Sequence, residues 1–141
     1  MSGFLLDTNV ISEITRPKPD ASVVEWIERT DESLLYLSVL TIGELRRGIF
    51  LLADGRRRAS LEAWFDNDLM LRFSGRILPI DLTVADRWGR ISAIAAANGT
   101  PIPVIYGLLA GTAVQYNLTI VSRDEAFGLI AGIEFFNPWR T

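Results

Sequence analysis

The sequence contains no cysteine and no histidine. Without cysteine, the chain can form neither a disulfide nor a thiolate nucleophile, and a cysteine-type zinc site is excluded. Without histidine, it lacks the commonest general base and the commonest transition-metal ligand, so a Ser-His-Asp triad cannot exist. Any metal ion must be held by oxygen atoms, which favours Mg²⁺ or Mn²⁺ over Zn²⁺ or Cu²⁺.

Lysine is almost absent as well, since Lys18 is the only lysine among 14 basic residues. Arginine suits phosphate and carboxylate partners better than lysine does, because its planar fork donates two parallel hydrogen bonds. The net charge of −3 provides no overall attraction to nucleic acid, although Arg46, Arg47 and residues 56–58 make the middle of the chain basic. A solvated helix face explains that basic run equally well.

Long apolar runs are missing too, although 49% of the residues are hydrophobic and residues 91–122 carry no charge. Prolines and polar residues interrupt that stretch, so no run of about 20 apolar residues remains to span a membrane. We expect a buried helix there, or a surface covered by a partner, and no membrane segment. The chain starts directly with a short strand rather than a signal peptide, which predicts a cytoplasmic protein.

The 141 residues fit one domain covering residues 1–141. Apolar runs predict strands at residues 3–6, 34–37, 77–80, 118–121 and 133–136. Helical periodicity predicts helices at residues 8–15, 41–53, 57–72, 83–97 and 103–116, and another after Asp20 or Ser22. Such alternation favours an α/β fold with a mostly parallel sheet covered on both faces, in which ligands bind beyond the carboxyl ends of the strands.

Three acids are expected at strand ends or helix starts: Asp7, Glu44 and Asp124. Each also has a purely structural interpretation. Asp7 can cap a helix, Glu44 follows Thr41 in a capping-box pattern, and Asp124 lies inside a second such pattern that begins at Ser122. If all three face one cavity, they repel one another and a divalent cation relieves that repulsion.

A bound divalent ion would make this cavity a hydrolytic site. It can lower the pKa of a coordinated water and stabilise charge on a phosphoryl oxygen without any histidine. Thr8, Asn9 and Ser122 are the candidates to orient the carboxylates or the coordinated waters.

Sequence blocks along nearly the whole chain match one family in order, namely Phe4 to Glu13, Leu40 to Gly48, Pro103 to Ile105, Gly107 to Ala110, Thr112-Ala113, Leu118 to Arg123 and Asn137 to Trp139. They resemble the PIN-domain ribonucleases, specifically the VapC-like and FitB-like toxins of bacterial type II toxin–antitoxin pairs. The resemblance implies a three-layer α/β sandwich with a central, mostly parallel sheet flanked by helices. It also implies an endoribonuclease that uses Mg²⁺ or Mn²⁺ to hydrolyse RNA phosphodiester bonds.

The resemblance implies partners and residue roles as well. Family members usually form homodimers and bind a cognate antitoxin in hetero-oligomers, with DNA contacted only through the antitoxin. Carried over by position, Asp7, Glu44 and Asp124 are the implied catalytic and metal-binding acids. Arg46 and Arg47 are candidates for contacts with RNA phosphates or antitoxin acids, and a solvent-facing helix surface is their alternative interpretation.

Position 106 departs from the family pattern. The family places an acid three residues after a proline, whereas this chain has Pro103-Val104-Ile105-Tyr106. That acid is normally a metal ligand, and a phenol is bulkier and largely protonated at neutral pH. Two interpretations stay open: Tyr106 impairs catalysis while the fold and antitoxin binding persist, or a rearranged site uses Asp7, Glu44, Asp124 and Glu125.

The resemblance therefore implies the toxin component of a type II toxin–antitoxin system, a metal-dependent endoribonuclease whose activity Tyr106 is expected to impair. The alternative is a catalytically weakened PIN module that binds its antitoxin and contributes to autoregulation of a promoter. RNA cleavage that requires a divalent ion and is abolished by Asp7→Ala would support the enzyme. Tight antitoxin binding without cleavage would support the module.

Overall fold

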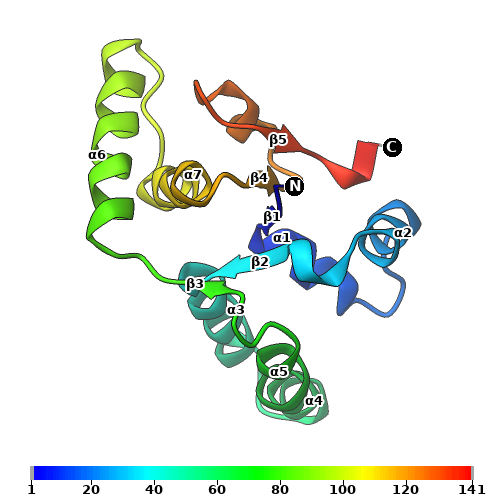
Figure 1. The fold of residues 1–141 in the computed structure, drawn as a ribbon. Coiled ribbons are helices and arrows are strands. Elements are labelled where there is room, and N and C mark those ends of the chain that lie inside the picture. The colour runs from blue at the N-terminus through cyan, green and yellow to red at the C-terminus, as the bar shows by residue number, and fades with distance from the viewer. Residues whose placement is uncertain (1, 141) are drawn as a thin grey trace.

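A sheet of parallel strands forms the centre of the molecule (Figure 1), seen in a computed structural model that describes residues 2–140. Met1 and Thr141, the ends of the predicted domain, lie outside the described residues. The strands are β1 (Phe4–Leu6), β2 (Leu35–Ser38), β3 (Ile77–Leu78), β4 (Thr119–Val121) and β5 (Phe135–Phe136). Their order is β3-β2-β1-β4-β5 and each neighbouring pair is parallel, which confirms the predicted α/β class.

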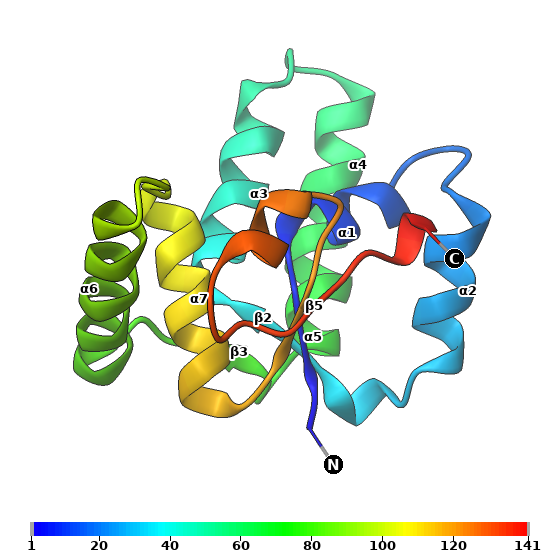
Figure 2. The ribbon, with the colours of Figure 1, turned by 90° about the horizontal axis from the view of Figure 1, so that it is seen from above.

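Helices cover both faces of this sheet (Figures 1 and 2). One face carries α1 (Thr8–Ile14), α2 (Ala21–Arg29), α3 (Val39–Leu51), α4 (Arg56–Trp64), the π-helical segment η2 (Phe65–Leu69) and α5 (Met70–Arg72). The other face carries α7 (Val104–Tyr116), with α6 (Leu82–Ala97) packed outside it. The described part of the chain also contains three short 3₁₀ turns: η1 (Glu32–Leu34), η3 (Glu125–Leu129) and η4 (Pro138–Arg140).

Side-chain alternation along the central strand explains the two layers of helices. Successive residues of a strand point to opposite faces of the sheet. Leu6 accordingly belongs to the core beneath α1 to α4, and its neighbour Leu5 belongs to the core beneath α7. Both leucines are 1% exposed, so the short β1 is buried on both sides, as parallel strands usually are.

The predicted strands and helices are present with small shifts at their ends, and one shift changes an interpretation. The third helix begins at Val39 rather than residue 41, because Ser38 caps it by accepting a hydrogen bond from the backbone N–H of Leu40 at 3.0 Å. Thr41 therefore lies inside the helix, fully buried, and its hydroxyl has no partner among the described residues. The alternative interpretation of Thr41 and Glu44 as a capping box is therefore wrong.

Two further predicted elements differ locally. The expected helix over residues 57–72 contains the π-helical turn η2 between α4 and α5. At η3, Asp124 is the residue that caps the turn, by accepting from the backbone N–H of Ala126 at 2.9 Å, so the capping box expected to start at Ser122 is not formed either.

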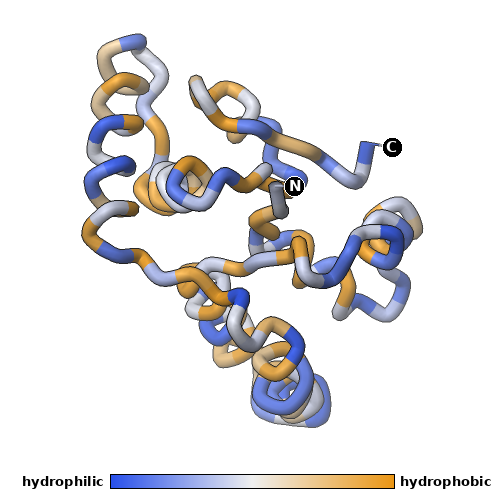
Figure 3. Tube along the Cα trace, viewed as in Figure 1, coloured by the Kyte–Doolittle hydropathy of each residue, from blue (hydrophilic) through white to orange (hydrophobic). Residues whose placement is uncertain are grey.

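The charge-free stretch is accounted for by packing. It contributes the end of α6, all of α7 and β4, and α7 lies between α6 and the sheet (Figures 1 and 2). Figure 3 shows hydrophobic residues along this part of the chain, in contrast to the hydrophilic outer side of α4. Within residues 2–140, no helix combines the length and the apolar character needed to cross a membrane.

Candidate functional site

The carboxyl ends of neighbouring strands bring the predicted acids to one edge of the sheet. Leu6 at the end of β1 is paired with Val121 at the end of β4, so Asp7 and Ser122 follow side by side. Glu44 comes from α3, which directly follows β2, the strand on the other side of β1. This is the edge at which parallel α/β sheets place their ligands.

Asp7 is both a helix cap and part of this polar cluster. Its Oδ1 accepts from the backbone N–H of Thr8 at 2.8 Å, and its Oδ2 accepts from the Ser122 hydroxyl at 2.7 Å. Burial raises the pKa of Asp7 above its ordinary value, and the negative charges of Glu44 and Asp124 raise it further, against the opposing effect of the two hydrogen bonds. The three acids thus lie near enough to repel one another.

Glu44 is held by a contact that the sequence pattern did not suggest. The hydroxyl of Thr8 donates to its Oε1 at 2.6 Å, which ties α3 to α1. Thr8 also supplies the N–H that Asp7 accepts, so one threonine joins two of the three acids. Glu44 therefore serves the cluster rather than the start of its own helix.

Ser122 and Asn9 connect Asp7 to Asp124. Ser122 is fully buried and accepts hydrogen bonds from Asn9 Nδ2 at 3.1 Å and from the backbone N–H of Asp124 at 3.0 Å. Asn9 also lies 3.4 Å from Asp7 Oδ2 and accepts from the backbone N–H of Arg123 at 3.2 Å. Thr8, Asn9 and Ser122, the predicted orienting residues, each contact at least one of the acids.

Tyr106 lies among these acids, in the first turn of α7. Its hydroxyl donates a hydrogen bond to Asp124 Oδ2, and its ring stacks on Phe127 with centroids 4.7 Å apart and planes at 12°. The pKa of Tyr106 is raised to about 12, first by the bond to Asp124, then by burial and by the charges of Asp124, Asp7 and Glu44. The phenol is therefore neutral at physiological pH and acts as a donor.

The cluster opens into a cleft of about 640 Å³. Besides Asp7, Glu44 and Tyr106, its lining includes residues that the sequence patterns do not single out as site residues: Glu13, Arg16, Arg57, Arg123 and Trp139. Glu13 is 5% exposed and is satisfied by the backbone N–H of Asp20 at 2.8 Å and by Arg16 at 3.4 Å. A charged residue on the apolar face of α1 is the sequence signal that would have identified it.

Arg46 and Arg47 are placed elsewhere. Arg46 pairs with Asp66 at 2.6 Å, and its guanidinium lies 4.0 Å from the centroid of the Phe65 ring. Arg47 is exposed on α3, and neither arginine is among the residues that line the cleft. Their contacts with RNA or an antitoxin stay a prediction, and the surface available to them lies outside the cleft.

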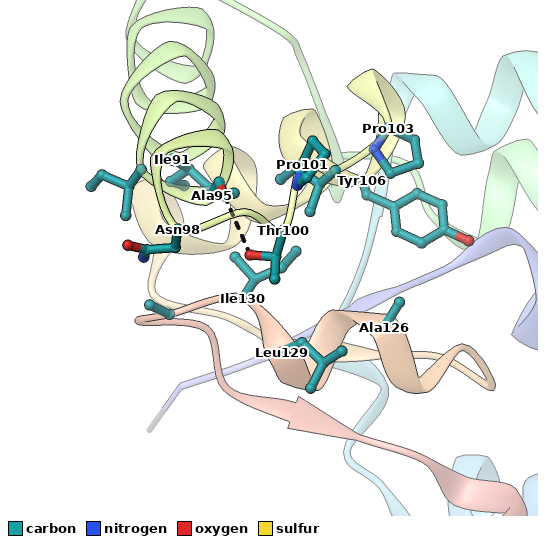
Figure 4. Close-up of a pocket in the computed structure, with 13 residues that line it drawn as sticks. Ile91, Ala95, Asn98, Thr100, Pro101, Pro103, Tyr106, Ala126, Leu129 and Ile130 are labelled. Atoms are coloured by element: carbon teal, nitrogen blue, oxygen red, sulfur yellow. Dashed lines mark hydrogen bonds between the residues drawn. The ribbon is translucent and has the colours of Figure 1, made fainter.

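A second, apolar cavity of about 210 Å³ shares Tyr106 with the cleft. Ile91 and Ala95 of α6, Pro101, and Ile130 after η3 are among its lining residues. Figure 4 shows the ring of Tyr106 extending away from α6, with its hydroxyl on the far side of the ring from Ile91 and Ala95. Tyr106 thus forms part of the wall between the apolar cavity and the cleft.

The residues do not fit a divalent metal ion in this arrangement. Across residues 2–140, no three acidic side chains come together closely enough to hold one. Both oxygens of Asp124 are already engaged, Oδ1 by the backbone N–H of Ala126 and Oδ2 by Tyr106. A neutral phenol stands where the resemblance expects a carboxylate. The site therefore has one carboxylate fewer to bind a cation, and the hydroxyl of Tyr106 occupies one oxygen of Asp124.

Comparison with known proteins identifies the family. The model of the PIN-domain family matches residues 4–133. The chain is 40% identical to "Toxin FitB" of Neisseria gonorrhoeae over 96% of this chain and 98% of that protein. It is 35% identical to "VapC ribonuclease Y4jK" of Sinorhizobium fredii over 96% and 97% of the two chains. A solved structure of FitAB bound to an IR36 DNA fragment superposes with a TM-score of 0.92, at 38% identity, covering 96% of this chain and 95% of that one.

Proposed function

Because this chain belongs to the PIN-domain family, we propose that it is the toxin component of a type II toxin–antitoxin system in which Tyr106 suppresses RNA hydrolysis. The relatives named a toxin and a ribonuclease align over nearly their whole length, so the likeness covers the entire fold and not one motif. PIN-domain ribonucleases generally depend on a divalent metal ion, which supports the cleft containing Asp7 and Glu44 as the region where the chemistry of the family would occur.

A cognate antitoxin is the proposed partner. The similar solved structure is of FitAB bound to an IR36 DNA fragment, which supports a hetero-oligomer that binds DNA as a complex. We propose a cytoplasmic homodimeric toxin within such a complex. Exposed apolar side chains such as Leu51 and Leu129, 68% and 82% exposed, provide surface for these contacts.

The hydrogen bond from Tyr106 to Asp124 carries the proposal of suppressed hydrolysis. It caps one oxygen of an acid that the family uses, and the stacking of Tyr106 on Phe127 holds the phenol in place. The raised pKa of Tyr106 keeps it protonated, so it cannot substitute for a carboxylate. Asp7 and Glu44 keep their positions, since their partners Ser122 and Thr8 do not involve position 106.

Restoring an acid at position 106 tests this proposal. Cleavage of a labelled single-stranded RNA is measured with Mg²⁺ or Mn²⁺ for the natural chain, for Tyr106→Asp and for Tyr106→Phe. We expect Tyr106→Asp to cleave at least about 10-fold faster, because loss of a group that only supports a metal ligand already costs about 10- to 100-fold. Tyr106→Phe frees Asp124 without adding a carboxylate, and we expect it to stay slow.

The double variant Tyr106→Asp with Asp7→Asn is the control for a contaminating nuclease, and it should lose the restored cleavage. A natural chain that cleaves as fast as Tyr106→Asp would refute suppression by Tyr106. The partner is tested separately: the natural chain is co-expressed with the product of a short open reading frame next to its gene, and the complex is sized. Absence of a complex, with both chains folded, would contradict the toxin–antitoxin assignment.

A further inference from the structure

Two arginines in the cleft lack a carboxylate partner. Arginines elsewhere mostly form ion pairs, as Arg90 does with Asp86 at 2.9 Å. Arg16, in the cleft, is paired with Glu13. Across the described part of the chain, by contrast, no acidic oxygen lies within ion-pair distance of Arg57 or Arg123. Both line the cleft and are exposed, so their charges are available to a ligand.

Each of these two arginines is held in position by neutral groups. The Arg57 guanidinium donates to the backbone oxygen of Thr15 at 3.3 Å, at the end of α1. Arg123 is fixed at the other end of α1, where its backbone N–H donates to Asn9. The two arginines are thus attached near opposite ends of α1, and they provide two separate cations for the phosphates of one strand.

Arg123 also lies over an aromatic ring. Its guanidinium carbon is 5.3 Å from the centroid of Trp139, which itself lines the cleft. An arginine beside an indole offers flat surfaces on which a nucleobase can stack, while the guanidinium N–H groups can donate to a phosphate. An acidic polypeptide would need the positive charge of Arg123 but not the neighbouring ring of Trp139. The pair therefore favours a single-stranded nucleic acid as the ligand.

The charged residues of the cleft lining indicate which groups could neutralise a phosphate backbone. With Glu13 and Arg16 paired, the remaining charges of the lining are Asp7 and Glu44 against Arg57 and Arg123. A polyanion entering past the two acids needs cations, and no metal ion fits the described acids as they are arranged. The two arginines are the groups of the lining that can supply them.

We propose that Arg57 and Arg123 hold backbone phosphates of single-stranded RNA across this cleft, and that they do so without a divalent metal ion. This inference rests on the proposed function for the identity of the nucleic acid. It assigns to the chain an RNA-binding step that survives the loss of the family acid at position 106. Arg57 and Arg123 are positioning residues, and they do not take part in bond breaking.

The test measures RNA binding in EDTA. A short fluorescein-labelled single-stranded RNA is titrated with the natural chain, Arg57→Gln and Arg123→Gln, by fluorescence anisotropy at several salt concentrations. We expect each substitution to weaken binding and to reduce the slope of log K against log salt by about 0.7, the value for one lost phosphate contact on a single strand. A loss of affinity through altered structure would not lower the slope by that amount.

Arg56→Gln is the matched control, because Arg56 is the neighbouring exposed arginine at the start of α4 and does not line the cleft. It should leave both affinity and slope near those of the natural chain. Equal weakening by Arg56→Gln, or unchanged binding in both cleft variants, would overturn the proposal. The same titrations with labelled polyglutamate test an acidic protein ligand, and tighter binding of polyglutamate that depends on Arg57 and Arg123 would also overturn it.

This result is independent of the cleavage assay. Binding in EDTA requires neither an acid at position 106 nor a metal ion. If Tyr106→Asp fails to cleave RNA while Arg57→Gln and Arg123→Gln still lower the salt slope, the suppression by Tyr106 fails and the RNA contacts stand. If Tyr106→Asp restores cleavage but Arg57→Gln and Arg123→Gln leave the salt slope unchanged, suppression by Tyr106 stands and the proposed RNA contacts fail.

Discussion

Ser122→Ala should destabilise the protein strongly for a change of one oxygen atom. Ser122 is fully buried, donates to Asp7 at 2.7 Å, and accepts from Asn9 at 3.1 Å and from the Asp124 N–H at 3.0 Å. A hydrogen bond to a charged group contributes about 1.5–3 kcal/mol, and a buried N–H left without a partner costs about 1–3 kcal/mol. Asp124 is partly exposed, so water can satisfy some of that N–H.

We therefore expect Ser122→Ala to lower the free energy of unfolding by about 2–4 kcal/mol. For a domain of this size, the corresponding drop in Tm is about 6–15 °C. The assay is urea unfolding at neutral pH followed by tryptophan fluorescence. Ser33→Ala is the matched control, because Ser33 also donates to an aspartate, Asp31 at 2.8 Å, but at an exposed position, and its stability should be indistinguishable from that of the natural chain.

A loss below about 1 kcal/mol for Ser122→Ala, with an unchanged urea m-value, would refute this reasoning. It would mean that the hydrogen bonds joining β1, β4 and η3 contribute little beyond what water supplies in their place. The same variant would then be expected to leave the position of Asp7 unchanged.

Three further predictions concern stability. The pKa of Asp7 is raised in the folded state, so ionisation of Asp7 opposes folding at neutral pH, and this cost is absent below the ordinary pKa of 3.8. In urea titrations, the free energy of unfolding of Asp7→Asn minus that of the natural chain should therefore increase from acid to neutral pH. A decrease of this difference over the same range would contradict the prediction. Gly107→Ala should lower stability by about 1–3 kcal/mol in thermal melts, because the added Cβ would lie 2.5 Å from Cδ1 of Trp88. Gly89→Ala on α6, where the added Cβ meets nothing within 4 Å, should raise stability by about 0.5–1 kcal/mol, and a change of the same sign in both variants would count against the packing argument. Asn117→Ala should lower stability by about 1 kcal/mol, since Asn117 ends α7 in the left-handed region at φ 55°, and equal melting temperatures would show that no strain is introduced.

Local sequence patterns predicted the elements and the edge of the sheet where the site lies. Asp7 and Asp124 follow strands β1 and β4, and parallel strands end at a common edge, so the apolar runs alone indicated that these acids approach one another. The absence of cysteine and histidine limits the chemistry of the site to oxygen ligands, whatever the fold. These inferences depend on periodicity and residue type, which are properties of the chain itself.

The tertiary structure was needed to show which distant residue each side chain contacts. Thr41 and Glu44 match a capping box, yet Glu44 is bound by Thr8, which is 36 positions away, because Ser38 already begins the helix. Arg46 is a candidate for the groove by sequence, but packing of α3 against η2 pairs it with Asp66 and leaves the cleft to other arginines. Such contacts follow from the register and packing of whole elements, which no short pattern encodes.

The sequence by itself determined that this chain folds as alternating strands and helices, and its resemblance to the PIN-domain family showed that position 106 lacks the family's acid. Only the tertiary structure decided what the tyrosine there does, since the packing of α7 against η3 stacks Tyr106 on Phe127 and aims its hydroxyl at Asp124. The physical reason is that residue type sets the available chemistry, whereas the geometry that brings two distant side chains into hydrogen-bond contact is a property of the packed core.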